Sequence, residues 1–207
     1  MHFPAFFDQV PSLRVQDPLA AFLGSAEDGI LLYHYADAVK LAGHSCPTVA
    51  SAYALGHKAM QRLYPENVPQ RGGVRIQFQQ PLTEGVTGVV ASILTLLTGA
   101  AQDGGFKGIG GQFVRQQRQV FDHPEQALQL RFTRIDNGQS VEAQAQLHLV
   151  PADPEMASLL PRCIHGEACH EEFARFRELW QGRVARLLCE HWDDDDVWCV
   201  RPVCHSR

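Results

Sequence analysis

The sequence predicts an α+β fold in which a mainly antiparallel sheet packs with helices. The prediction depends on the order of patterns along the chain: helical periodicity comes first, strand patterns in hairpin order follow, and helical periodicity returns. In a chain of 207 residues, 45% hydrophobic and 20% charged side chains are typical of a folded domain with a well-buried core. We expect one α+β domain over residues 1–155 and a helical extension over residues 156–207 that packs on the same core.

Two helices with a tight corner between them are expected first. In residues 28–41, "DGILLYHYADAVKL", the apolar positions recur at helical spacing: Ile30, Leu31, Ala38 and Leu41. Gly43 stands where a helix C-cap glycine belongs, and Pro47 suits the first position of a second helix. The inward face of that second helix is expected to contain Val49, Ala52, Tyr53, Gly56, Met60 and Leu63.

Strand patterns and one buried helix follow. Residues 72–81, "GGVRIQFQQP", alternate apolar and polar side chains, which predicts a strand buried on one face. Residues 86–99, "VTGVVASILTLLTG", are apolar nearly all round, which predicts a helix at the centre of the fold. Strands are then expected within residues 112–121, 127–135 and 140–150, and the last two flank Asn137-Gly138, a strong hairpin-turn signal.

The C-terminal third predicts an amphipathic helix over residues 171–192 that closes the core. Its inward face is expected to contain Phe173, Phe176, Trp180, Val184, Leu187 and His191. The same third contains many metal-ligand side chains: Cys163, His165, Cys169, His170, Cys189, His191, Cys199, Cys204 and His205. Their spacings lack the close Cys-x-x-Cys pairs of structural zinc sites, so a second metal site there stays open.

Charge and hydropathy disfavour two classes of partner. A net charge of −5 gives no field that attracts nucleic acid or an anionic membrane. The first residues show no secretion-signal pattern, and the most apolar segment, "VVASILTLLTG", is too short to cross a bilayer. We therefore expect a cytoplasmic protein with no nucleic-acid or membrane partner, whose cysteines are free thiols or metal ligands.

The corner between the first two helices combines a thiol with an imidazole. Cys46 is expected at a helix N-terminus, a position that favours the thiolate, and His44 can turn toward the same point. A thiolate and an imidazole suit zinc or another late transition metal. Two alternatives stay open: Cys46 is a small buried residue and His44 caps the preceding helix, or the two form a metal-free nucleophile and base.

A glycine-rich stretch predicts a second point of interest. Residues 103–111, "DGGFKGIGG", contain five glycines around Phe106 and Lys107. Such a loop brings backbone N–H groups close to an anion, and Lys107 adds positive charge. We expect this loop, with Lys107 and Arg115, to rim a small-molecule or cofactor pocket; the alternative is a flexible turn between the buried helix and the next strand.

Both stretches resemble one known family. Residues 41–60, "LAGHSCPTVASAYALGHKAM", resemble the His-Gly-His-x-Cys-Pro-Gly signature of the E-subunit family of molybdenum- and tungsten-dependent formylmethanofuran dehydrogenase. His44, Cys46 and Pro47 match its second histidine, cysteine and proline. Residues 96–111, "LLTGAAQDGGFKGIGG", resemble the same family's Thr-Gly-Cys-Thr segment and the glycine-rich loop that follows it.

The resemblance implies an α+β homodimer that binds metal through these two motifs. It also implies a metalloenzyme or an accessory factor of a molybdenum or tungsten partner enzyme. The chain departs from the pattern at three positions, because Ala42, Thr48 and Ala100 replace the first histidine, the glycine and the second motif's cysteine. Two usual ligands are therefore missing.

His34 is the best substitute ligand in the sequence. It falls on the expected inward stripe of the first helix, with Asp37 nearby as an acceptor that could orient its ring. The alternative is a histidine hydrogen-bonded inside the core. The sequence thus predicts a metal site of His44, Cys46 and His34.

Overall fold

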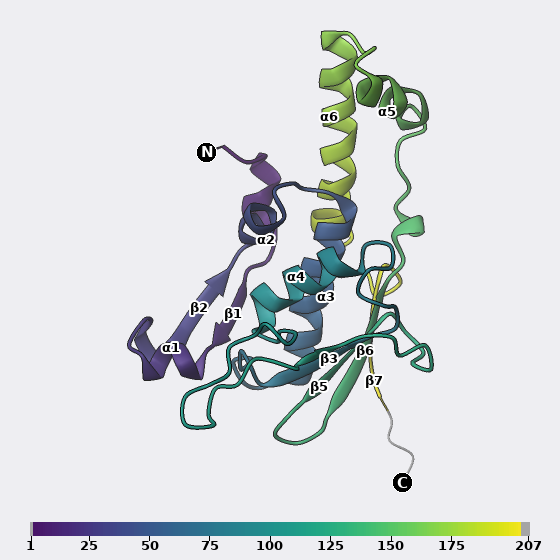
Figure 1. The fold of residues 1–207 in the computed structure, drawn as a ribbon. Helices are drawn as coiled ribbons and strands as arrows, with labels where there is room; N and C mark the ends of the chain where they lie inside the picture. Colours follow the sequence, from purple (N-terminus) through teal and green to yellow (C-terminus); the bar gives the residue numbers. More distant parts are fainter. Residues whose placement is uncertain (1, 204–207) are drawn as a thin grey trace.

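The computed structural model describes residues 2–203 and confirms an α+β fold (Figure 1). The N-terminal elements are η1 (Ala5–Gln9), β1 (Leu13–Gln16), α1 (Pro18–Phe22), η2 (Glu27–Gly29), β2 (Ile30–Tyr33), α2 (Tyr35–Ala42) and α3 (Pro47–Leu63). The middle of the chain forms β3 (Val74–Phe78), α4 (Thr87–Thr98), β4 (Gln119–Val120), β5 (Leu130–Arg134), β6 (Ser140–Ala145) and η3 (Leu147–Leu149). The chain then continues through α5 (Met156–His165), α6 (His170–Ala185), the π-helical turn η4 (Arg186–Glu190) and β7 (Trp198–Pro202).

The main sheet has the strand order β4-β3-β5-β6-β7. Its pairs are antiparallel except for β3 and β4, which run parallel. The expected hairpin is present, because β5 and β6 pair from Thr133 opposite Ser140 to Leu130 opposite Ala143. Gly138 lies in its turn at a φ of 73°, a conformation that favours glycine.

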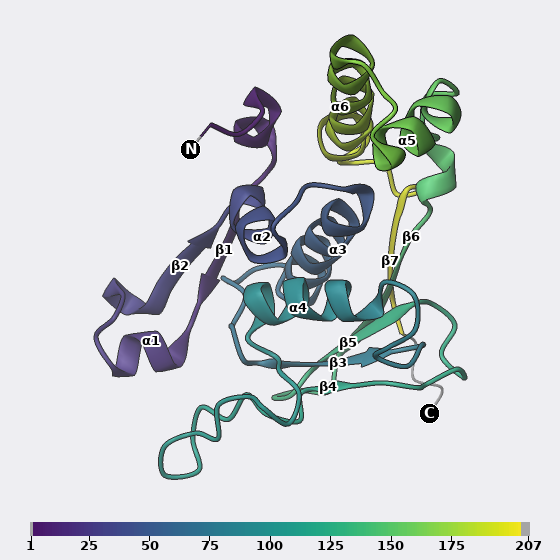
Figure 2. The same cartoon turned by 45° about the horizontal axis from the view of Figure 1, so that its top comes forward.

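The helices α3 and α4 pack together and cover one face of the sheet (Figure 2). A β-carbon at Gly56 of α3 would lie 2.8 Å from a Leu94 methyl group and 2.9 Å from one of Leu97 on α4. The glycine therefore lets the two helices approach closely. The expected inward face of α3 is buried, and most of α4 is buried as the sequence predicts.

The prediction of a helix over residues 28–41 is wrong in its first half. Residues 30–33 form β2, which pairs antiparallel with β1, and α2 begins only at Tyr35. Gly29 precedes the strand at a φ of 67°, and a β-carbon there would overlap the Asp17 carbonyl oxygen. This turn returns the chain along β1, and the cross-strand hydrogen bonds outweigh a helical spacing built from only a few apolar residues.

The C-terminal helix is inside the core only at its end. Val184 and Leu187 are buried, but Phe173 and Phe176 are partly exposed, since the first half of α6 stands out from the sheet beside α5 (Figure 1). The prediction that this helix closes the core is therefore confirmed at Val184 and Leu187 but is wrong for Phe173 and Phe176. The chain then returns and adds β7 to the edge of the sheet beside β6, a strand that no sequence pattern indicated.

None of the helices in residues 2–203 combines the length and the apolar character that a membrane crossing requires.

Candidate functional site

The expected corner is the link between α2 and α3. The helix α2 ends at Gly43, which adopts a left-handed φ of 76°, and α3 begins at Pro47. His44, Ser45 and Cys46 form the three-residue link between these ends. The predicted C-cap glycine and first-turn proline are both confirmed, so the sequence located this corner correctly.

His44 is exposed, and its ring is held by the backbone. The Nδ1 atom lies 3.0 Å from the carbonyl oxygen of Ala42, the last residue of α2. A carbonyl can only accept a hydrogen bond, so this contact places the ring proton on Nδ1 and leaves the lone pair of a neutral ring on Nε2. The Nε2 atom of His44 is therefore a potential metal ligand. Through Nδ1 the same ring caps α2, as expected in the alternative in which His44 caps the preceding helix.

Cys46 is the N-cap residue of α3. Its Sγ atom accepts a hydrogen bond of 3.5 Å from the backbone N–H of Val49, and the residue is 8% exposed. The sulfur therefore occupies the electropositive end of a 17-residue helix, at the boundary of the hydrophobic core.

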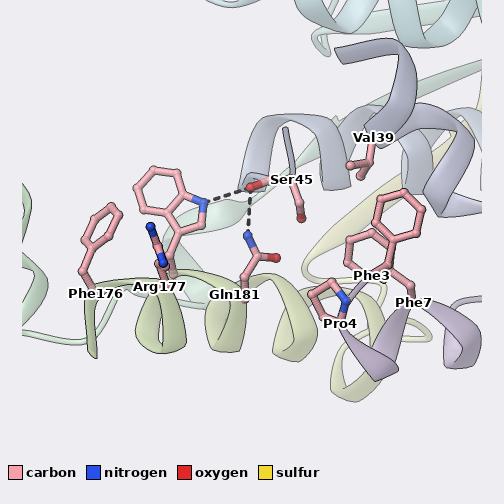
Figure 3. Close-up of a pocket in the computed structure, with 9 residues that line it drawn as sticks. Phe3, Pro4, Phe7, Val39, Ser45, Phe176, Arg177 and Gln181 are labelled. Atoms are coloured by element: carbon pink, nitrogen blue, oxygen red, sulfur yellow. Dashed lines mark hydrogen bonds between the residues drawn. The ribbon is translucent and has the colours of Figure 1, made fainter. Parts of the chain in front are cut away.

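The C-terminal helix secures the corner from outside. Trp180 Nε1 and Gln181 Nε2 donate hydrogen bonds of 2.9 and 3.2 Å to the Ser45 carbonyl oxygen (Figure 3). The hydroxyl groups of Ser45 and Tyr35 are 2.9 Å apart and hydrogen-bonded. Ser45 is thus bound from two sides, which restricts the two potential ligand residues beside it.

An apolar cavity of about 370 Å³ borders the corner at Ser45 (Figure 3). Its walls contain aromatic rings from two ends of the chain: from η1 and the residues just before it, and from α6. The lining residues are Phe3, Pro4, Phe7, Val39, Ser45, Phe176, Arg177, Trp180 and Gln181. The volume and the apolar lining with a few polar groups are typical of a small-molecule site.

His34 does not join this corner. It is the N-cap residue of α2, its side chain is 57% exposed, and its Nδ1 atom lies 3.8 Å from a carboxylate oxygen of Asp37. His44 follows the opposite end of the same helix, and eight helical residues separate the two by about 12 Å. The prediction that His34 lies on an inward helical stripe is wrong, because the helix starts after it.

Within residues 2–203, no three His, Cys, Asp or Glu side chains converge closely enough to hold a metal ion. Cys163 ends up in α5, Cys169 is the N-cap of α6, Cys189 lies in η4, and Cys199 lies in β7. Cys204 and His205 lie outside the described residues. The four cysteines of the C-terminal third that the structure describes are thus spread over separate elements.

The glycine-rich stretch borders a second cavity of about 520 Å³. Arg115 lines it and is 6% exposed, whereas Lys107 is exposed and lies outside the lining. The lining residues are Arg71, Thr95, Gly99, Ala101, Gln102, Gly104, Gly105, Phe106 and Arg115. A cavity with Arg115 and Arg71 in its wall therefore borders the glycine-rich stretch, and Lys107 is not part of its lining.

Asp17 holds the two arginines of this second cavity. Its carboxylate accepts hydrogen bonds of 2.8 Å from Arg71 and 2.6 Å from Arg115. Burial raises the pKa of Asp17, but the hydrogen bond from Arg71 and the charges of both arginines outweigh it and hold the pKa below its ordinary value. The sequence analysis did not predict Asp17 or Arg71 as site residues. The Asp-Pro pair at residues 17–18 is typical of a helix N-cap, which Asp17 also forms, and does not indicate an ion pair with either arginine.

No protein-family model matches the chain, and no curated protein matches it.

Proposed function

We propose that this chain is a metal-binding protein in which His44 and Cys46 supply the protein ligands for zinc or another late transition metal at the corner between α2 and α3. The observation that carries the proposal is the contact between His44 Nδ1 and the Ala42 carbonyl oxygen. Metal-ligating histidines characteristically donate their second ring N–H to such an acceptor, which orients the ring and fixes its tautomer.

The position of Cys46 gives further support. A sulfur at a helix N-terminus faces backbone N–H groups and the positive end of the helix dipole, both of which stabilise a thiolate. The Val49 N–H group already donates to this sulfur. A thiolate and a neutral imidazole are ligands that zinc accepts readily.

Two protein ligands leave other coordination positions to water, a small molecule or another chain, as catalytic zinc sites leave one position open. The cavity that borders Ser45, the residue between the two proposed ligands, would hold an organic ligand with an apolar body. Zinc in such a site supplies Lewis acidity when bound. The proposal extends to the family that the motif resembles, and with it to a cytoplasmic homodimer that acts as a metalloenzyme or serves a molybdenum or tungsten partner enzyme.

The test is elemental analysis of untagged protein, wild type and Cys46→Ser, His44→Gln and Cys163→Ser. We expect close to one equivalent of metal in wild type and in Cys163→Ser, whose cysteine lies in α5, and at least a tenfold lower content in the other two. Equal, sub-stoichiometric metal in all four proteins would overturn the proposal.

Alkylation by iodoacetamide separates this proposal from the metal-free Cys–His pair. A ligand thiolate should react only after a chelator has removed the metal, since coordination occupies the sulfur lone pair. Equal alkylation of Cys46 with and without chelator, in protein that contains no metal, would instead favour a nucleophile.

A further inference from the structure

We propose that the cavity between the glycine-rich loop and the Arg71–Asp17–Arg115 cluster binds the oxyanion group, carboxylate or phosphate, of a small molecule. This site is separate from the proposed metal corner, and neither proposal depends on the other.

The cluster carries more positive than negative charge. Asp17 is one carboxylate between two guanidinium groups, and its side chain is 5% exposed. It also caps α1 by accepting from the backbone N–H groups of Leu19 and Ala20, at 2.9 and 3.3 Å. Asp17 is therefore fully engaged, and a net positive charge is left on two arginines at the cavity wall.

Arg115 is the less satisfied of the two arginines. Its Nη2 atom donates to Asp17, but its buried Nη1 atom has no hydrogen-bond partner among residues 2–203. Arg71, in contrast, donates to Asp17 through Nη1 and to the carbonyl oxygens of Leu96 and Thr95 through Nε and Nη2. A buried cationic group with an unpaired N–H donor is costly, and an anion offsets that cost.

The backbone passes close to the Arg115 guanidinium group at two glycines. A β-carbon at Gly72 would overlap Nη1, and one at Gly99 would lie 2.5 Å from it. Both glycines have positive φ, 81° and 72°, so each is suited to its turn as well as to the close approach. Two glycines from separate turns thus make room for one cationic side chain that is otherwise incompletely paired.

The rest of the lining suits the apolar part of such a ligand. Phe106 is 43% exposed and, with Ala101, gives the cavity an apolar surface beside the arginines. A carboxylate or phosphate can form two parallel hydrogen bonds with a guanidinium group, which is a preferred way to recognise either anion. A small acid with a flat apolar body fits both halves of the cavity.

The experiment is isothermal titration calorimetry of the full chain with two probes, inorganic phosphate and benzoate, at constant ionic strength. We expect saturable one-to-one binding of at least one probe to wild type and to Arg75→Gln, whose exposed arginine lies outside the lining. Phosphate alone would indicate a phosphorylated ligand, and benzoate alone a carboxylic acid. Arg115→Lys should bind at least tenfold more weakly, because it loses the guanidinium fork.

Gly104 supplies a second pair of variants that leaves the ion cluster intact. A β-carbon at Gly104 meets nothing within 4 Å, and this glycine is absent from the positive-φ positions, so a side chain is accommodated there. Gly104→Glu places a carboxylate in the cavity and should bind the probe at least tenfold more weakly than the matched Gly104→Gln. No saturable binding of either probe to wild type, or equal binding by the two Gly104 variants, would overturn the proposal even where Arg115→Lys does not fold.

Discussion

At the corner, residues 44–46 follow one another in the chain, and each contacts its own partner within the surrounding helices. At the cavity, Asp17 and Arg115 meet across 98 residues of sequence, and Arg71 reaches the same carboxylate from a third segment. The side chains of His44 and Cys46 are held by contacts within three residues of the chain, although α6 also reaches Ser45 between them. The second site instead brings together three segments that are far apart in the sequence. A substitution at the corner should therefore change function more than stability, and one at the cavity should change both.

The largest expected effect is at Asp17. Asp17→Asn leaves Arg71 and Arg115 without their shared counter-ion in a buried setting, so we expect the free energy of unfolding to fall by about 3 to 5 kcal/mol. Urea denaturation measures this loss. The matched control is Asp136→Asn, which removes a carboxylate that is 55% exposed and pairs with Arg134; it should cost about 1 kcal/mol or less. Equal losses would mean that the cluster is not a buried charge network.

A pH titration distinguishes the contribution of His57 to stability from that of Asp17, because each is lost over a different pH range. His57, in α3 below the corner, is 2% exposed, donates from Nε2 to the Ser12 carbonyl oxygen and packs 4.9 Å from the Trp192 ring. Burial lowers the pKa of His57 from 6.5 to about 4. The unfolded chain therefore takes up a proton first as the pH falls, and stability should be lost between about pH 6.5 and pH 4, by up to about 3 kcal/mol.

The stability that the charged form of Asp17 contributes is lost over a lower pH range. Because the folded-state pKa of Asp17 is below its ordinary 3.8, this stability is fully present above about pH 4 and is lost only as the pH falls further. Urea unfolding at successive pH values checks both windows. His57→Gln should remove the loss between pH 6.5 and pH 4, whereas the exposed His34→Gln should leave it unchanged. A wild-type stability that is flat across that range would contradict the buried, neutral state of His57.

The smallest expected effect is at the contact between α6 and the corner. Trp180→Phe keeps an aromatic ring but removes the hydrogen bond to the Ser45 carbonyl oxygen, which Gln181 still satisfies. We expect a loss of about 1 kcal/mol in thermal or urea unfolding. The control is Phe173→Leu, near the projecting end of α6. A loss no larger than that of the control would show that α6 does not restrain the corner.

The difference between the two regions also explains what could be predicted from the sequence. Gly43 and Pro47 carry strong local signals for a helix end and a helix start, so the corner with His44 and Cys46 was predictable. The Asn137-Gly138 hairpin and the buried α4 were predictable for the same reason, because each depends on neighbouring residues.

The wrong predictions for residues 30–34 and the unpredicted contacts of Asp17 and Arg71 have one physical cause, namely contacts between segments that are distant in the sequence. The apolar spacing of residues 30–41 resembles a helix, but pairing of β2 with β1 decides the structure of residues 30–33, and this pairing is not visible locally. The prediction that His34 lies on an inward helical stripe fails for the same reason, because α2 begins after it. Asp17 and Arg71 were missed because no spacing in the chain indicates that they meet Arg115.

The most direct test of the central claim is the absorption spectrum of the protein after incubation with cobalt(II). If Cys46 and His44 bind the metal together, wild type should show a sulfur-to-cobalt charge-transfer band. Cys46→Ser should lose this band, and His44→Gln should lower the cobalt affinity at least tenfold. Cobalt that binds wild type and Cys46→Ser with identical spectra, or that does not bind wild type, would contradict a metal site at the corner.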